Sequence, residues 1–454
     1  MVGRRKSKDA PLKGLSQRLK EDRLSQLPEC LLCEILNHLP TKQVVTTSIL
    51  STRWRSLWLS VTCMELETRY FSNLDAFTSF GDRFLYSNRV SRIDKLTLMI
   101  DHENDASSLT SWVDASVKRK IQHLHVRTSY FLKMPPSLYV CETLVSLKLY
   151  RLKLPSAEFV SLPCLRAMHL HCNKYPNEAT FEKIISSSLI LEELEISMVY
   201  NDAKMYRVQS LSLRRLCLQQ YSLRFDHVVE VVIDAPLLCS LRIKDSIKKI
   251  SIVNNLGSNA KLDIDLNFGL RDFVEASVSS TRSCFRSFLP RIAKVMDMTI
   301  SVDTFGFIRQ YSQLEPELEP LPQFGYMSRL CITLHVSDLK WFEIFLQSCP
   351  NLKSLILAVH VGHYRRLYSE EINQISFPSV VPECLLSSLE FVDFKFSIKG
   401  CTEEMKLVSY FLENSALLKK LTLRLASPSL KKDEVFKKIF KIPRASTKCE
   451  VVIL

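Results

Sequence analysis

The sequence predicts an α/β protein in which parallel strands stack into an irregular repeat solenoid, with short helices before it and a strand–helix unit after it. Three observations support this fold class. An apolar LxxLxL-type motif recurs through the middle of the chain, apolar residues near the amino terminus follow helical spacing, and strand and helix patterns alternate near the carboxyl terminus. Recurrence at a regular period is typical of repeat architectures, in which neighbouring units bury a shared core.

Residues 21–66 predict three short helices. Pro28 suits the first turn of a helix, because its missing N–H costs nothing there. Apolar residues then recur three and four positions apart as far as Leu39, and Pro40 ends this helix. Thr41 can cap a second helix, and a third follows it.

The third of these helices carries Trp54 and Trp58 on one face. Three helices in about 40 residues cannot bury two tryptophans and their aliphatic neighbours unaided. Two interpretations remain open at this point. The apolar surface packs on the rest of the chain, or a second protein completes the core with Trp54 and Trp58 as its aromatic anchors.

The central motifs recur at a spacing that identifies the repeat. Their second apolar residues are Leu96, Leu124, Leu147, Met168, Leu194, Leu216, Leu241 and Leu262, which are 21 to 28 residues apart. Leucine-rich repeats span about 20–29 residues, one strand plus a return segment each. Beyond Leu262 the pattern continues at Met298, Leu330, Leu355, Leu389 and Leu421, at intervals of 25 to 36 residues. We therefore expect an irregular leucine-rich-repeat solenoid with insertions in its second half.

Residues between the apolar positions of each strand should line the concave face, which is the usual binding surface of solenoids. The candidate target-binding residues are His123, His125, Lys148, His169, His171, Glu195 and Arg242, and Cys217 and Thr422 hold equivalent positions. Each histidine pair lies on one face of its strand, but a metal site needs three or four ligands. The only further ligand nearby in sequence is Cys172, on the opposite side of its strand. We therefore expect ordinary polar surface here, with no metal and no cofactor.

The carboxyl-terminal part alternates strands and helices. We expect a strand over residues 389–396, a turn at Gly400, a helix capped by Thr402, a strand over 420–425, a helix over 431–440 and a last strand over 449–454. Such a unit can extend and close a solenoid. Paired lysines in the 431–440 helix alternate with apolar residues at helical spacing, so they indicate a solvated helix face rather than a nucleic-acid site.

Composition excludes several classes of function. The 9 glycines are never closer than eleven residues, so glycine-rich phosphate loops and the GxSxG nucleophile elbow cannot occur. No stretch without Asp, Glu, Lys or Arg exceeds eleven residues, whereas a membrane helix needs about 20 largely apolar ones. We therefore expect no membrane partner.

Charge and cysteine content bear on the compartment. Of the formal net charge of +13, the first twenty residues contribute seven Lys or Arg against a single Asp. This tail is expected to be a solvated, disordered arm, with a nuclear-import or anionic-surface patch as the alternative. The 14 cysteines are scattered, and Cys30 and Cys33 form the only CxxC. Because the tail does not read as a secretory signal, we expect a reducing compartment, the nucleus or the cytoplasm.

The amino-terminal helices resemble a plant F-box. The resemblance lies in Leu27-Pro28, in the run EILNHLPTK from Glu34 to Lys42, and in SILSTRWRSLW from Ser48 to Trp58. It implies binding to a Skp-type adaptor, which links F-box proteins to a cullin-based ubiquitin ligase. The positions that match the family's adaptor contacts are Leu27, Pro28, Leu31, Ile35, Leu36, Leu39, Pro40, Val44, Val45, Leu50, Trp54, Leu57 and Trp58.

The carboxyl-terminal unit resembles the FBD domain of plant F-box proteins. The matching features are VPECL from Val381 to Leu385, Gly400, the run Leu412-Glu413-Asn414, and PRAS followed by Cys449. The expected organisation is a basic tail (1–20), an F-box (21–66), leucine-rich repeats (67–375) and an FBD cap (376–454).

This organisation implies a non-catalytic substrate-recognition subunit of an SCF-type ubiquitin ligase, which brings a bound target protein close to the conjugating machinery. Two alternatives remain. A scaffold could bind the Skp-type adaptor, or sequester a partner, without ubiquitin transfer. A hydrolase or transferase would need a cluster of catalytic residues, and the sequence nominates none.

Overall fold

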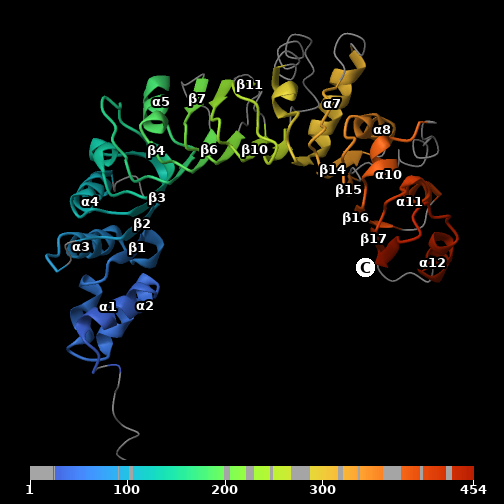
Figure 1. Ribbon diagram of the computed structural model, residues 1–454. Coiled ribbons are helices and arrows are strands. Elements are labelled where there is room, and N and C mark those ends of the chain that lie inside the picture. Colours follow the sequence, from blue (N-terminus) through green and yellow to red (C-terminus); the bar gives the residue numbers. More distant parts are fainter. Residues whose placement is uncertain are drawn as a thin grey trace, which may run out of the picture.

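The chain forms an arc of stacked strands with helices on its outer side (Figure 1). The computed structural model describes residues 24, 26–89, 92–101, 106–198, 205–220, 230–245, 249–266, 287–314, 321–335, 338–360, 380–398, 402–425 and 432–454. The predicted basic tail (1–20) and the predicted turn at Gly400 lie outside these residues.

A 15-stranded sheet lines the inner side of the arc. Its order is β1-β2-β3-β4-β5-β6-β8-β10-β12-β13-β14-β15-β16-β17-β18, and neighbouring strands are parallel throughout. The strands are β1 (Cys63–Glu67), β2 (Lys95–Ile100), β3 (His123–Lys133), β4 (Ser146–Lys153), β5 (Ala167–His171), β6 (Glu193–Met198), β8 (Arg215–Gln220), β10 (Ser240–Asp245), β12 (Lys261–Asp265), β13 (Asp297–Ile300), β14 (Arg329–His335), β15 (Ser354–His360), β16 (Phe391–Ile398), β17 (Lys420–Leu425) and β18 (Glu450–Ile453). The predicted α/β solenoid is confirmed.

Helices and a small second sheet make up the rest of the described fold. The helices are α1 (Glu29–Asn37), α2 (Thr41–Thr46), α3 (Leu74–Leu85), α4 (Ala106–Lys118), α5 (Glu178–Ser186), α7 (Val302–Leu314), α8 (Leu339–Gln347), α10 (Glu383–Ser387), α11 (Thr402–Asn414) and α12 (Lys432–Phe440). The 3-10 segments are η1 (Thr47–Ile49), η2 (Trp54–Leu59), η3 (Thr68–Tyr70), η5 (Pro136–Val140) and η6 (Leu289–Ile292). Strands β7 (Met205–Gln209), β9 (Glu230–Asp234) and β11 (Lys249–Ile252) form a parallel sheet on the outer side (Figure 1).

The apolar repeat positions align in one column across the main sheet. The aligned residues are Met64, Leu96, Leu124, Leu147, Met168, Leu194, Leu216, Leu241, Leu262, Met298, Leu330, Leu355, Val392 and Leu421. Each is at most 3% exposed, so this column is the continuous core that the period predicts. The prediction that Leu389 belongs to it is wrong. Leu389 is buried just before β16, and Val392 takes the aligned place because the strand starts two residues later than expected.

The carboxyl-terminal unit continues the same sheet. β16 pairs with β15 of the repeats, and β17 and β18 follow in parallel. Helix α11 begins at Thr402, where the sequence predicts its cap, and α12 begins one residue after the start of the predicted 431–440 helix. Their apolar residues Val408, Phe411 and Ile439 are buried. The carboxyl-terminal unit therefore packs in the same way as the repeats and extends the solenoid.

Candidate functional site

The amino-terminal helices form one tip of the arc (Figure 1). The chain itself buries the inner face of these helices, where Leu32 and Leu36 are at most 1% exposed. Trp54 and Trp58 are only 6% and 5% exposed. Trp58 stacks on Phe80 of α3 with ring centroids 4.8 Å apart and planes at 11°, and the Arg83 guanidinium carbon lies over the Trp58 ring, 5.4 Å from its centroid. The chain itself therefore buries both rings, as the first of the two interpretations expects, and a role for Trp54 and Trp58 in adaptor binding remains a prediction.

Burial divides the thirteen residues that match the family's adaptor contacts. The buried ones are Leu36, Val44, Trp54, Leu57 and Trp58, and the partly buried ones are Leu27 and Val45. The exposed ones are Pro28, Leu31, Ile35, Leu39, Pro40 and Leu50. Only the exposed and partly buried members can touch another protein without rearrangement of the helices.

The outer face of α1 carries a row of exposed apolar side chains. Leu31, Ile35 and Leu39 follow one another at four-residue spacing and are 50%, 44% and 37% exposed. We call these three residues the outer apolar row. Ile49 and Leu50, which follow α2, are 80% and 64% exposed. Ile49 ends the 3-10 segment η1, and only the fold reveals its exposure.

Polar contacts fix these helices to the first strand of the solenoid. The Asn37 side-chain oxygen accepts hydrogen bonds from the Thr62 and Cys63 amides at 2.9 and 3.3 Å. The Thr41 hydroxyl oxygen accepts one from the Glu65 amide at 2.7 Å. The expectation that Thr41 caps the second helix is thus replaced by a different role, in which it joins α2 to β1.

The predicted target-binding residues lie on the strands of the inner sheet. Most of them belong to one register column, in which each residue pairs with the next across adjacent strands. The predicted residues in this column are His125, Lys148, His169, Glu195, Cys217, Arg242 and Thr422. The same column also contains Thr97, before His125, and Asp263, after Arg242. His123 and His171 lie in the two flanking columns. The structure therefore brings these residues onto one face. Their role in binding a target remains a prediction.

Residues that are register partners on adjacent strands make specific contacts on this face. The ring of Tyr150 stacks on His171 with centroids 4.3 Å apart and planes at 2°. His169 Nδ1 lies 3.1 Å from a carboxylate oxygen of Glu195, and Arg242 donates to Asp263 at 2.8 Å. Burial lowers the pKa of His125, and the ammonium of Lys148 lowers it further.

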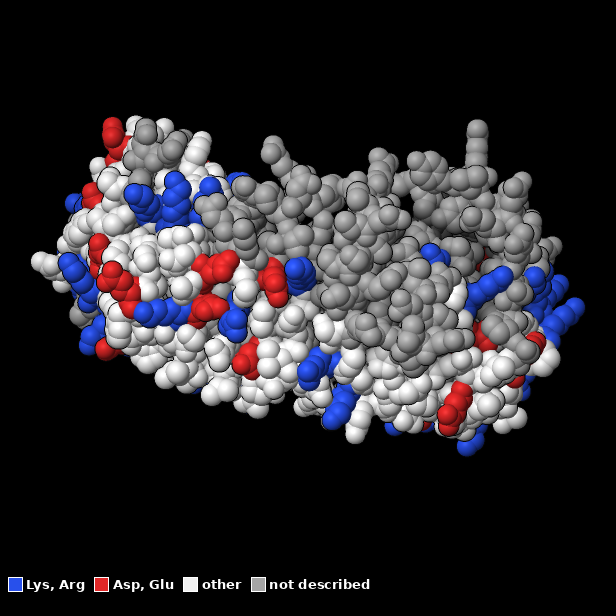
Figure 2. Space-filling model, turned by 90° about the horizontal axis from the view of Figure 1, so that it is seen from above, with Lys and Arg blue, Asp and Glu red and all other residues white. Residues whose placement is uncertain are grey.

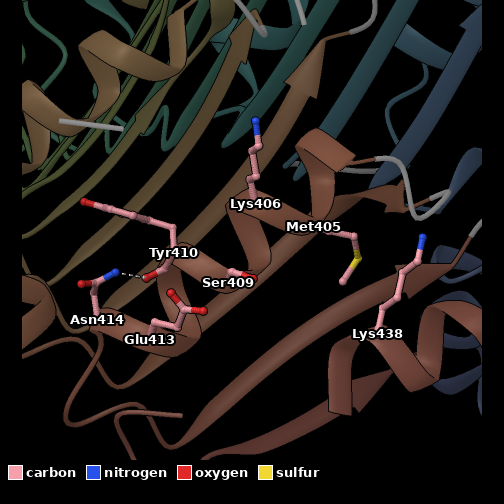
Figure 3. A pocket seen from close by; sticks show the side chains of 7 residues that line it. All are labelled: Met405, Lys406, Ser409, Tyr410, Glu413, Asn414 and Lys438. Carbon is pink, nitrogen blue, oxygen red and sulfur yellow. Dashed lines mark hydrogen bonds between the residues drawn. The ribbon is translucent and has the colours of Figure 1, made fainter. Parts of the chain in front are cut away.

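A cleft of about 520 Å³ lies at the other tip, between α11 and α12 (Figure 3). It is lined by Met405, Lys406, Ser409, Tyr410, Glu413, Asn414 and Lys438. The Asn414 amide donates to the Tyr410 carbonyl oxygen at 2.8 Å, within the helix. Its lining residues include one serine hydroxyl but no histidine or cysteine.

Charges on the described surface seen from above the arc are mixed. Blue Lys and Arg and red Asp and Glu lie close together over the left half of this view, rather than in separate fields (Figure 2). Among the described residues, ion pairs also join neighbouring repeats, such as Arg215 with Glu193 at 2.8 Å and Arg166 with Glu192 at 2.5 Å. Among the described helices, none combines the length and the apolar character required to span a bilayer.

Comparison with known families accounts for this arrangement. The F-box domain matches residues 24–65, the leucine-rich repeats described for the FBD-associated F-box protein At5g56370 match 109–259, and the FBD matches 377–423. A short helical unit on the end of a repeat solenoid, with these matches, defines an adaptor-type F-box protein. The F-box implies a Skp-type adaptor as its partner.

Relatives in Arabidopsis thaliana align with this chain over nearly their whole length. The chain is 56% identical to an FBD-associated F-box protein (At5g53635), covering 95% of this chain and 100% of the relative. It is 54% identical to an F-box/FBD/LRR-repeat protein (At2g05300), with 97% and 99% covered, and 39% identical to F-box/LRR-repeat protein 13, with 95% and 96% covered. The chain belongs to the F-box/FBD/LRR-repeat protein family.

Proposed function

We propose that this protein is the substrate-recognition subunit of an SCF-type ubiquitin ligase. The outer apolar row, with Ile49 and Leu50, binds the Skp-type adaptor, and the concave face of the sheet binds a target protein. The target is thereby held for ubiquitination and proteasomal degradation. The chain supplies position and no catalytic group, so the rate gain comes from effective concentration.

The exposed apolar residues of the amino-terminal helices carry this proposal. Leu31, Ile35 and Leu39 remain exposed although the opposite face of the same helices is fully packed. Completing the burial of a half-exposed Leu or Ile is worth roughly 1 kcal/mol, since full burial is worth about 1.5–3 kcal/mol. Five such side chains together supply several kcal/mol to a complex.

The shape of the molecule supports the second half of the proposal. One continuous parallel sheet joins the adaptor-binding tip to the carboxyl-terminal tip (Figure 1). The sheet is therefore a semi-rigid support between the two binding surfaces. For any given binding position on the concave face, the distance from the target to the adaptor is fixed.

Co-purification with a Skp-type adaptor tests the interface. We expect the wild-type pair to co-purify, and the double variant Leu31→Asp/Ile35→Asp to lose the adaptor while keeping its circular dichroism spectrum. Leu211→Asp is the matched control, because Leu211 is 80% exposed and lies between two strands of the repeats, away from the amino-terminal helices. Retention of the adaptor by the double variant would refute this interface.

Reconstitution tests the ligase activity. With adaptor, cullin and charged conjugating enzyme, a captured target should gain ubiquitin, and it should fail to do so with the double variant. A complex that assembles but transfers nothing would instead support the scaffold alternative. The proposal also places the protein in the nucleus or cytoplasm, which a fluorescent fusion would check.

A further inference from the structure

Three side chains on adjacent strands converge on the concave face. His169 and His171 lie on β5, and Glu195 lies opposite His169 on β6. One candidate ligand atom from each of the three side chains can be chosen so that all three atoms lie within 4.8 Å of one another. Glu195 shares no local sequence motif with the two histidines. It lies beside them only because β6 pairs with β5 in this register.

The separations fit a single small cation. His169 Nδ1 lies 3.1 Å from Glu195 Oε2, and His171 Nε2 lies 3.7 Å from Glu195 Oε1. Ligands placed about 2.1 Å from a tetrahedral zinc ion lie about 3.4 Å from one another. The two observed distances bracket this value, so small rotations of the side chains are sufficient to bind an ion.

Other groups orient each imidazole toward this point. His171 Nδ1 lies 2.8 Å from the Ser197 hydroxyl, and His171 Nε2 is buried with no hydrogen-bond partner. The stacked ring of Tyr150 fixes the plane of the same imidazole. His169 Nε2 faces a carboxylate oxygen of Glu193 at 3.5 Å. Ligating histidines in proteins are held in this way, through a partner on the nitrogen that does not bind the metal.

One charged group opposes a cation at this point. Lys148 lies opposite His169 on β4, and its ammonium repels a bound cation.

We propose that His169, His171 and Glu195 form a site for a divalent transition cation of the zinc class on the concave face. Two histidines and one glutamate are an established zinc ligand set, and three protein ligands leave a coordination position open to water or to a side chain of a bound protein. This proposal does not depend on the ligase function.

Cobalt(II) and zinc titrations of the full-length protein test the site. Cobalt should give d–d absorption bands at one ion per chain without a thiolate charge-transfer band, which separates this site from the cysteines. Zinc should displace the cobalt. We expect His169→Ala/His171→Ala to weaken binding by at least about 100-fold, since even the loss of a supporting hydrogen bond costs about 10–100-fold.

Two further variants keep the test decisive. Glu195→Gln preserves the shape of the side chain and should weaken binding at least about tenfold. Lys148→Met should strengthen binding, which a purely structural effect would not do. The control is His123→Ala/His125→Ala, a histidine pair of the same spacing whose register neighbours on β4 are Ser146 and Lys148. Unchanged binding in the His169→Ala/His171→Ala variant, or a spectrum dominated by thiolate bands, would overturn the proposal.

Discussion

At the scale of single residues, Asn173 shows how one polar side chain joins two repeats. It follows β5 and is 2% exposed. Its side-chain oxygen accepts from the Leu152 amide at 2.9 Å, and its side-chain nitrogen donates to the Leu149 carbonyl at 3.0 Å. These two bonds satisfy backbone groups at the end of β4, just beside the His169 and His171 pair.

We expect Asn173→Ala to lower the free energy of unfolding by about 1–3 kcal/mol, because it leaves buried backbone groups without partners. Urea unfolding followed by circular dichroism measures this. Asn88→Ala, at an exposed position, is the control and should be close to neutral. Equal midpoints for the two variants would contradict the role given to Asn173.

At the scale of elements, the amino-terminal helices have two faces with different tasks. Trp58 packs against α3, and the outer apolar row on α1 faces away from the core. Substitutions on the two faces should therefore disable adaptor binding for different reasons, one through folding and the other through contact.

Trp58→Ala should destabilise this unit by about 3–5 kcal/mol, the usual cost of removing a buried aromatic side chain. We expect faster amide hydrogen exchange in α1 and α2 together with loss of the adaptor. Leu31→Asp/Ile35→Asp should lose the adaptor with unchanged exchange. If Trp58→Ala left the exchange rates unaltered, the packing of η2 on α3 would not be what holds this unit together.

Helix α8 contains a buried carboxyl group, Glu343, which is 1% exposed. Burial raises its pKa more than the neighbouring Tyr410 hydroxyl of α11 lowers it. The folded state therefore holds this proton more tightly than the unfolded state, so its contribution to stability is greatest at acidic pH and falls as the pH rises through the raised pKa.

We expect Glu343→Gln, which keeps the shape and removes the charge, to melt at a higher temperature than wild type at pH 7–8. The difference should shrink toward pH 4, as the wild-type carboxyl becomes protonated. Thermal melts across this range measure it, with the exposed Glu413→Gln as control. A constant difference at all pH values would exclude the buried charge as its cause.

At the scale of the whole molecule, the repeats and the carboxyl-terminal unit share one sheet. β15 pairs with β16 over four residues, from Ser354 with Phe391 to Leu357 with Phe394. Leu355 and Leu357, which are fully buried, belong to the last strand before this unit. Removal of the unit would expose both the strand edge and this apolar surface.

We therefore expect a fragment ending at residue 379 to aggregate, since an exposed edge with buried apolar residues is a template for association. Size-exclusion chromatography and light scattering of the fragment and the full chain measure this. A monomeric fragment with the full-length melting temperature for its repeats would show that the two parts fold independently.

The sequence determined the features that depend on local pattern. The 21- to 28-residue spacing predicts which apolar residues align, because strands of equal pattern stack in register. Pro28 and Pro40 predict the limits of α1, because proline is tolerated in the first turn of a helix and ends a helix elsewhere. The observed α1 lies between them. The irregular boundary at β16 escaped prediction because its apolar run permits two alignments, through Leu389 or through Val392.

Only the tertiary structure decided which faces are free and which residues meet across strands. Trp54 and Trp58 are the aromatic type that often anchors an interface, yet the fold buries both and leaves Leu31, Ile35 and Leu39 exposed. Glu195 lies 26 positions after His169 and meets it only through the pairing of β5 with β6. The physical reason is common to both cases: burial and proximity between distant segments depend on the packing of whole elements, which local periodicity does not encode.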